Sequence, residues 1–179
     1  MDLDRLASPA LDVRPEAAQD FAAVRNIHER AFAPSREEAD LVEALRATRD
    51  HVPQLCLIAA RGASVIGHIA FSRARLDSGH PLLALAPMGV LPEHQRQGVG
   101  SALVRDGLLR AAETEYPLVV VVGHGAYYPR FGFEPATPLG ITAPFEVPDE
   151  AWMVHRLPGY RDDARGTVAY PDAFSTVSA

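Results

Sequence analysis

A polar segment with two glycines, residues 95–100, joins an apolar run at residues 82–90 to a sequence whose apolar residues recur at three- and four-residue spacing. The apolar run does not alternate, which is typical of a central strand covered by helices on both faces, and the repeat after the loop predicts an amphipathic helix. Glycines let a backbone approach an oxyanion closely, and the first N–H groups of a helix are unpaired. This segment therefore predicts an α/β fold with an anion site at a strand-to-helix turn.

Pro87 interrupts the predicted central strand. Because proline cannot donate a hydrogen bond to a sheet ladder, we predict a bulge or a splay of the strand at this point. The other periodic segments have strand or helix character in the mixture that an α/β domain requires. Strands are predicted at residues 11–14, 55–60, 65–71, 82–90, 117–122, near 133, 152–157 and 167–170, and helices at residues 17–32, 35–45, 103–112 and, as a short helix or turn, 126–130.

Chain length and composition predict a small globular protein. The 179 residues fit one domain, residues 1–179, in which residues 171–179 are a tail whose order the sequence leaves open. The net charge of −6 argues against a nucleic-acid surface. The chain start lacks a signal-peptide pattern and no apolar run reaches the roughly 20 residues that span a bilayer, so we expect a cytoplasmic protein without a membrane segment. Cys56 is the single cysteine, and no metal site is predicted.

Several nucleotide-binding motifs are excluded by composition and spacing. All 17 basic residues are arginines, so neither a P-loop lysine nor a Schiff-base lysine exists. A Rossmann loop needs a third small residue after its first two glycines, but Leu103 occupies that position here. A second Gly-x-Gly, at Gly123 and Gly125, fails the same test because Tyr128 stands at its third position. Nicotinamide and ATP chemistry are therefore disfavoured.

Two motifs, in the correct order, resemble those of the GNAT N-acetyltransferase superfamily. Gln95-x-x-Gly98-x-Gly100 is similar to motif A of that family, and the run from Tyr127 to Phe133, which ends in Gly-Phe, is similar to its motif B. One helix and one strand separate the two motifs, and their combination is far more specific than either alone. The similarity covers nearly the whole chain and extends to a bacterial subgroup described as predicted N-acetyltransferases.

The resemblance implies the GNAT fold, a mixed and splayed sheet of six to seven strands flanked by about four helices, with acetyl-CoA as co-substrate in a cleft beside the central strand. It implies that the backbone of Met88, Gly89 and Val90 pairs with pantetheine, and that the N–H of Val90 polarises the thioester carbonyl. It assigns the pyrophosphate of CoA to the loop residues Gln95, Arg96, Gln97, Gly98, Val99, Gly100 and Ser101.

Acetyl transfer to an amine needs a group that removes the proton of the amine and a group that assists the departing thiolate. Tyr128 matches the tyrosine of the family that lies four residues before the glycine of Gly-Phe, and is predicted to be the acid or thiol partner. His124 is the first candidate for the base, because histidine titrates near neutral pH, and deprotonation through water is the alternative. We expect Glu93 to lie on the loop surface and His68 to pack within its strand.

The resemblance implies an acetyltransferase that acts by direct attack of a primary amine, from a small molecule or a protein, in a ternary complex. A non-catalytic acyl-CoA-binding or regulatory module with the same fold is the alternative. The acceptor pocket is expected around residues 32–34 and 138–152, which carry no diagnostic pattern. Arg130 either binds a phosphate of CoA or forms a salt bridge at the sheet edge. The sequence leaves open the acceptor, the preferred acyl length and whether the protein is a monomer or a homodimer.

Overall fold

The computed structural model describes residues 10–176, in which nine strands form a mixed sheet in the order β1-β2-β3-β4-β5-β8-β6, with β9 beside β3 and β7 beside β9. The strands are β1 (Leu11–Pro15), β2 (Leu57–Arg61), β3 (Ser64–Leu76), β4 (Pro81–Val90), β5 (Leu118–Val122), β6 (Glu134–Pro135), β7 (Ile141–Thr142), β8 (Trp152–Arg156) and β9 (Gly166–Ala169). The α-helices are α1 (Phe21–Ala31), α2 (Glu37–Arg46) and α3 (Val99–Ala111). The 3-10 helices are η1 (Ala18–Asp20), η2 (Pro53–Leu55), η3 (Pro92–His94), η4 (Tyr128–Phe131), η5 (Thr137–Leu139) and η6 (Asp172–Thr176).

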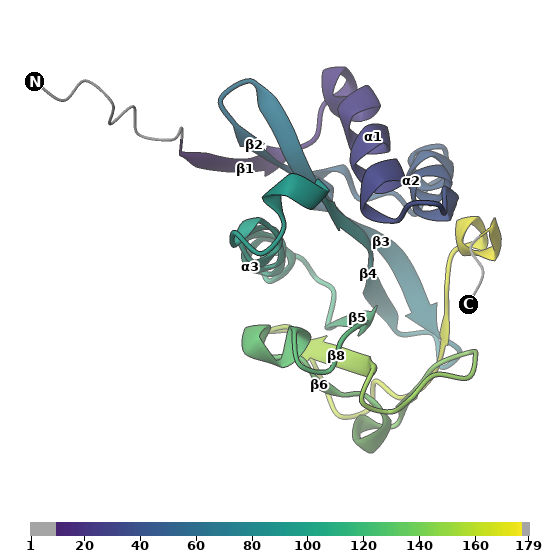
Figure 1. Ribbon diagram of the computed structural model, residues 1–179. Helices are drawn as coiled ribbons and strands as arrows, with labels where there is room; N and C mark the ends of the chain where they lie inside the picture. The colour runs from purple at the N-terminus through teal and green to yellow at the C-terminus, as the bar shows by residue number, and fades with distance from the viewer. Residues whose placement is uncertain (1–9, 177–179) are drawn as a thin grey trace, which may run out of the picture.

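Helices cover both faces of the central hairpin β3–β4, with α1 and α2 on one face and α3 on the other (Figure 1). Leu103 and Val104 of α3 are fully buried in the largest hydrophobic core, which also holds Phe71 of β3. At Gly107, α3 approaches the sheet so closely that an added β-carbon would lie 2.6 Å from the ring of Phe71. Burial of such side chains stabilises the fold by about 1.5–3 kcal/mol each, so this core fixes α3 against β4.

The central strand β4 separates from its neighbour β5 partway along its length. The parallel pairing of the two strands is confined to Leu83 with Val119 and Ala84 with Val120, and the register between β4 and β3 shifts just beyond, between Ile69 and Phe71. The shift lies beside Pro87, as the missing N–H of proline requires. The predicted irregularity of this strand is therefore confirmed, and it opens the sheet between β4 and β5.

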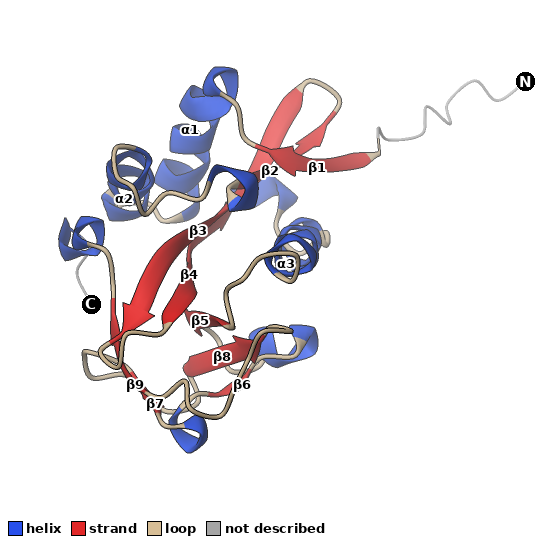
Figure 2. Cartoon of the chain, turned by 180° about the vertical axis from the view of Figure 1, so that it is seen from behind, coloured by secondary structure: helices blue, strands red, loops and turns tan. Residues whose placement is uncertain are grey.

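The helix and strand counts differ from the expected six to seven strands and about four helices. Within residues 10–176 there are nine strands and three α-helices. The strand predicted near residue 133 corresponds to β6, whereas β7 was not predicted because its two residues are too short to show alternation. The expected fourth helix is the 3-10 helix η4, which contains Pro129 and ends at Gly132 in the left-handed conformation. Figure 2 shows that β6, β7, β8 and β9 gather at the end of the molecule opposite β1 and β2.

Part of the predicted tail is folded onto the body of the protein. Residues 172–176 form the 3-10 helix η6, in which Ala173 packs with Leu41 and Leu45 of α2. Residues 177–179 lie outside the described part of the chain. The C-terminal segment thereby joins α1 and α2 on one side of the opened sheet. No helix of residues 10–176 is both long and apolar enough to cross a bilayer.

Candidate active site

A groove of about 1570 Å³ lies where β4 and β5 diverge. Its floor is the second half of β4, one wall is the glycine loop with the start of α3, and a second wall follows β5 and η4. Residues near the α1–α2 connection, the loop before β8 and the C-terminal segment close the other end. Eight of the ten residues predicted to bind the cofactor line this groove: Met88, Gly89, Val90, Gln95, Arg96, Gly98, Gly100 and Ser101.

Beyond Ala84, β4 has no neighbouring strand on the side away from β3 within the described residues. The N–H of Leu91 donates to the carbonyl of Ile66 on β3 at 3.0 Å, which sets the alternation of the ladder. Since alternate residues of an antiparallel strand address the same neighbour, Met88 and Val90 direct their N–H and C=O groups away from β3 and toward the groove. The carbonyl of Val90 accepts a hydrogen bond from the side chain of Gln95 at 3.0 Å, so the glycine loop is tied to this edge.

The glycine loop presents the unpaired start of α3 to the groove. Gly98 caps the helix with φ of 85°, a left-handed conformation that glycine adopts without steric cost. The first helical hydrogen bond runs from the N–H of Ala102 to the carbonyl of Gly98 at 3.0 Å, so the N–H groups of Val99, Gly100 and Ser101 have no partner within the helix. Together with the helix dipole, these donors make an anion site.

Arg96 also has a left-handed backbone, with φ of 59°, although it is not a glycine. Such a conformation costs a side-chain-bearing residue roughly 1–2 kcal/mol, and strain of this kind concentrates at functional sites. The side chains of two loop residues point elsewhere. Gln97 donates to the carbonyl of Glu93 at 2.8 Å, and Val99 is 1% exposed in the core. The predicted set therefore divides into eight groove residues and two whose side chains hold the loop in place.

The adjacent tyrosines of η4 lie in different surroundings. Tyr128 is 7% exposed and packs edge to face on Phe133, with ring centroids 5.4 Å apart. Burial raises the pKa of Tyr128, so its phenol stays protonated at neutral pH. Tyr127 is half-buried beneath Arg130, whose guanidinium lies 4.5 Å from the centre of the Tyr127 ring. Both tyrosines line the groove, and the sequence had singled out only Tyr128.

His124 lies exposed at the end of β5, in the wall of the groove. Its carbonyl accepts the N–H of Tyr127 at 2.9 Å, which fixes the turn into η4. Glu93 is exposed, as predicted, and pairs with Arg30 at 2.9 Å. The prediction that His68 packs within its strand is also confirmed, since it is fully buried in β3.

Arg130 lines the groove and forms no ion pair within the described residues. Its Nε instead donates to the carbonyl of Tyr127 at 3.2 Å. The alternative of a salt bridge at the sheet edge is therefore wrong for the described part of the chain. An unpaired guanidinium in a groove is free to meet an anionic group.

The far end of the groove is mostly apolar. Its lining includes Phe32, Leu41 and Phe145, which lie in the two regions expected to hold an acceptor or next to them. The C-terminal residues Tyr170 and Phe174 complete it, with ring centroids 4.7 Å apart. Sequence reasoning missed this contribution because only the tertiary contact of η6 with α2 brings these rings to the groove.

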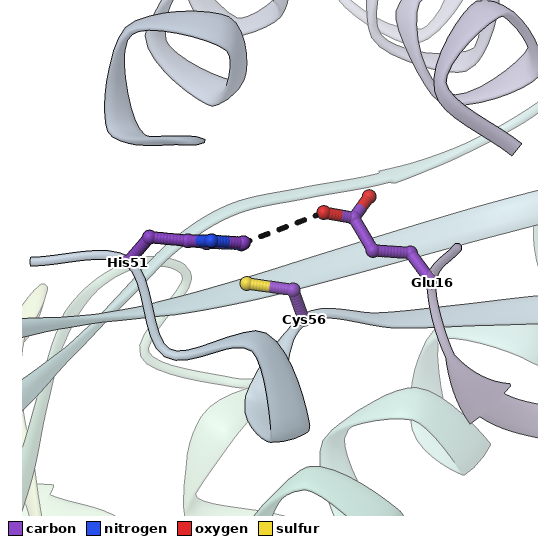
Figure 3. Close-up of side chains that lie close together, drawn as sticks. All are labelled: Glu16, His51 and Cys56. Carbon is purple, nitrogen blue, oxygen red and sulfur yellow. Dashed lines mark ion pairs between the residues drawn. The ribbon is translucent and has the colours of Figure 1, made fainter. Parts of the chain in front are cut away.

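A buried polar cluster lies between α2 and β3. Glu16, His51 and Cys56 offer ligand atoms within 4.8 Å of one another (Figure 3). Arg46 already contacts both carboxylate oxygens of Glu16, one of them at 3.0 Å. Burial raises the pKa of the Cys56 thiol to about 12, which disfavours the thiolate that a metal needs. This arrangement favours a salt bridge over metal ligation.

The sequence profile of the acetyltransferase (GNAT) domain matches residues 12–136, which is more than half of the chain. The chain belongs to the GNAT acetyltransferase family. Among curated relatives, the uncharacterized N-acetyltransferase YjhQ of Escherichia coli K12 is 40% identical over 145 residues, or 77% of this chain and 80% of YjhQ. The uncharacterized N-acetyltransferase YhbS of the same strain is 34% identical over 170 residues, or 91% of this chain and 98% of YhbS.

Solved structures of GNAT proteins share the whole architecture. The structure of Escherichia coli YhbS in complex with CoA superposes with a TM-score of 0.85 at 31% identity, covering 96% of this chain and 97% of that one. A GNAT acetyltransferase of Brucella melitensis in complex with acetyl-CoA superposes with a TM-score of 0.77 at 31% identity, covering 92% of this chain and 98% of the other. The GNAT fold expected from the two motifs is thereby confirmed.

Proposed function

We propose that this GNAT protein transfers the acetyl group of acetyl-CoA to a primary amine by direct attack in a ternary complex. One observation carries the proposal: the edge of β4 that lacks a neighbouring strand and the start of α3, whose N–H groups have no partner within the helix, line the same groove. An amide-rich linker can pair with a strand edge, and a pyrophosphate suits a helix start. Acetyl-CoA contains both groups in one molecule.

In this assignment, the pyrophosphate binds the N–H groups at Gly98, Gly100 and Ser101, and Arg96 supplies positive charge. Pantetheine lies along Met88 and Val90, whose N–H and C=O groups face the groove. The N–H of Val90 then donates to the thioester oxygen, where negative charge develops in the tetrahedral intermediate. The acetyl-CoA and CoA complexes of the two solved relatives support this choice of co-substrate.

The proposed transfer moves two protons. The amine nitrogen attacks the thioester carbonyl, its proton leaves, and the C–S bond breaks to release CoA. We assign protonation of the departing sulfur to Tyr128, because its buried phenol is kept protonated. His124, on the groove wall, is the proposed acceptor of the amine proton, directly or through water.

A carboxylate in the acceptor half of the groove supports a cationic amine as the acceptor. Glu38 is half-buried and lines the groove. Its carboxylate accepts a hydrogen bond from Ser35 Oγ at 3.1 Å and forms no ion pair within the described residues. A half-buried carboxylate without a counter-ion favours a cation beside it. The apolar rings around it suit the carbon skeleton of the amine.

The first test is a thermal-shift titration of the purified protein with acetyl-CoA, CoA and NAD. A ligand at 100 times its Kd stabilises the native state by about 2.7 kcal/mol. We expect acetyl-CoA and CoA to raise the melting temperature, and NAD to leave it unchanged. No shift with either CoA ligand would refute the cofactor assignment.

Release of free thiol from acetyl-CoA in the presence of a panel of amines then separates the two functional classes. A transferase releases thiol with at least one amine, and its Tyr128→Phe variant does so more slowly. The alternative, an acyl-CoA-binding module, binds acetyl-CoA but releases thiol with none of them.

A further inference from the structure

Two buried histidines connect the floor of the groove to Glu16. His28 of α1 and His68 of β3 are both fully buried, and His28 Nε2 lies 2.8 Å from His68 Nδ1. On its other side, His68 Nε2 lies 3.3 Å from Glu16 Oε2, a short polar contact whose angles are not those of a hydrogen bond. Arg46 of α2 holds the carboxylate of Glu16 in place. Residues from α1, α2, β3 and the turn after β1 thus meet in one cluster of polar atoms.

The charge of Glu16 determines which ring nitrogens of His68 and His28 carry a proton, and therefore in which direction the hydrogen bond between the two rings runs. Burial raises the pKa of Glu16, but the contacts with His51, His68 and Arg46 outweigh burial and hold it well below its usual range, so the carboxylate is ionised. The nearby carboxylate favours a proton on His68 Nε2, because a bare lone pair there would be repelled by the carboxylate. The Nδ1 of His68 is therefore an acceptor, and His28 donates from Nε2. In a neutral His28, this leaves Nδ1 unprotonated.

The unprotonated Nδ1 of His28 lies against Gly89 of β4, the strand along which acetyl-CoA is proposed to bind. His68 stands directly opposite Gly89 in the β3–β4 register, so their side-chain directions share the face on which α1 packs. A β-carbon added at Gly89 would lie 3.0 Å from His28 Nδ1 and 3.2 Å from its Cε1. Nδ1 has no hydrogen-bond partner among the described residues. The imidazole therefore occupies the space that a side chain at position 89 would fill.

We propose that Glu16, His68 and His28 form a directional relay that supports Gly89 from behind and makes His28 a positioning residue for the segment Met88–Val90. The inference rests on the proposed binding of acetyl-CoA along that segment. Because His28 is held by its contact with His68, its ring fixes the distance between α1 and β4. Val90 follows Gly89 directly in the chain. The orientation of the Val90 N–H toward the thioester oxygen therefore depends on the contact between His28 and Gly89.

Other charged groups around the relay are accounted for by different contacts. His51 Nε2 lies 3.6 Å from Glu16 Oε1, and the Cys56 sulfur lies 3.9 Å from the carbonyl oxygen of Phe71. Arg46 binds Glu16 and stacks 3.8 Å over the ring of Phe21. The three atoms nearest to a β-carbon at Gly89 belong to His28 and Ile27, so the relay reaches β4 through His28.

The direction of the relay is testable in the wild-type protein by long-range ¹H–¹⁵N NMR of the histidine rings. At pH 7, we expect His28 and His68 to be neutral and protonated on Nε2. Addition of acetyl-CoA should shift the His28 Nδ1 resonance and leave that of His80, in the turn at the far end of the β3–β4 hairpin, unchanged. The proposal would be overturned if His28 were protonated on Nδ1, or if the His28 Nδ1 resonance did not shift on addition of acetyl-CoA.

A matched pair of variants tests the positioning role. His28→Gln keeps an N–H donor for His68 but removes the ring from Gly89, and should raise the Kd for acetyl-CoA about tenfold. His51→Gln changes a histidine of the same cluster that does not reach β4, and should leave the Kd within about twofold. Equal affinities in the wild type and His28→Gln would overturn the positioning role alone. Absence of binding by the wild type would overturn the proposed function and the positioning role with it, while the ring tautomers would still report the direction of the relay.

Discussion

The hydroxyl of Tyr127 lies against Gly100, so that a β-carbon placed on this glycine would meet the hydroxyl oxygen at 3.0 Å. Gly100 belongs to the first turn of α3, whose unpaired N–H groups face the groove. The next residue in the chain, Tyr128, turns its ring against Gly123 instead. Two adjacent tyrosines thus reach different parts of one site, and single substitutions can separate their roles.

The first prediction concerns these tyrosines. Tyr128→Phe should slow acetyl transfer by about 10²-fold or more, because a positioned general acid typically contributes 10²–10⁴-fold. Its affinity for acetyl-CoA should stay unchanged, since the ring is retained. Tyr127→Phe is the matched control and should retain most of the rate. Thiol release and acetyl-CoA titration of both variants measure the two quantities. A slow Tyr127→Phe beside a fully active Tyr128→Phe would assign the acid to Tyr127.

The second prediction concerns the packing that holds Tyr128. A β-carbon at Gly123 would lie 2.2 Å from Tyr128 Cε2, so Gly123→Ala forces the ring out of its place. We expect a loss of about 1–3 kcal/mol in the free energy of unfolding, the usual cost of overpacking a core. Urea denaturation measures it. In a Tyr128→Leu background the same substitution should cost clearly less, and equal costs in both backgrounds would contradict the contact.

The third prediction concerns the arginines at the cofactor end of the groove, Arg96 and Arg130. Neither forms an ion pair within residues 10–176, and both line the groove. Replacing either one with Gln should weaken acetyl-CoA binding about threefold to tenfold at low salt, and less at 0.15 M salt, where charges are screened over about 8 Å. Arg75→Gln changes an exposed arginine of β3 that does not line the groove, and this control should bind like the wild type. Calorimetric titration at both salt concentrations measures the Kd for acetyl-CoA of each variant. Equal Kd values for a variant and the wild type at low salt would contradict the prediction for that arginine.

The local part of the site was predictable because its signals are local. The apolar run around Pro87 and the loop from Gln95 to Gly100 each carry their information within a few residues, and the structure places most of that predicted set in one groove. The sheet order was not predictable in the same way. Strand β8 inserts between β5 and β6, and no short-range pattern specifies which strands will pair at such separation.

The acceptor end and the relay show the same limit. His28 and His68 are 40 residues apart, so the sequence predicts a buried His68 but neither the burial of His28 nor the contact between the two rings. Phe174 reaches the groove only because η6 packs on α2. Hydrophobic periodicity predicts whether a segment is a helix or a strand and which face is buried. It does not predict which other element that face will contact.

The fourth prediction concerns pH. Burial lowers the pKa of both His28 and His68, so the native state binds fewer protons than the unfolded chain, whose histidines titrate near about 6.5. Stability is therefore complete above that pH and falls as the pH decreases toward the lower native pKa values, by up to about 1.4 kcal/mol per pH unit for each histidine. Glu16 does not contribute in this range, because its unfolded pKa of about 4.3 lies below it.

Urea midpoints measured between pH 7 and pH 5 should show this loss, and His28→Gln should reduce the slope because one buried histidine no longer has to become charged. Burial also lowers the pKa of His155, so the difference between the two slopes, rather than the wild-type slope alone, measures His28. A His28→Gln slope equal to that of the wild type would mean that His28 accepts a proton in the native state, which is incompatible with a neutral ring held against Gly89.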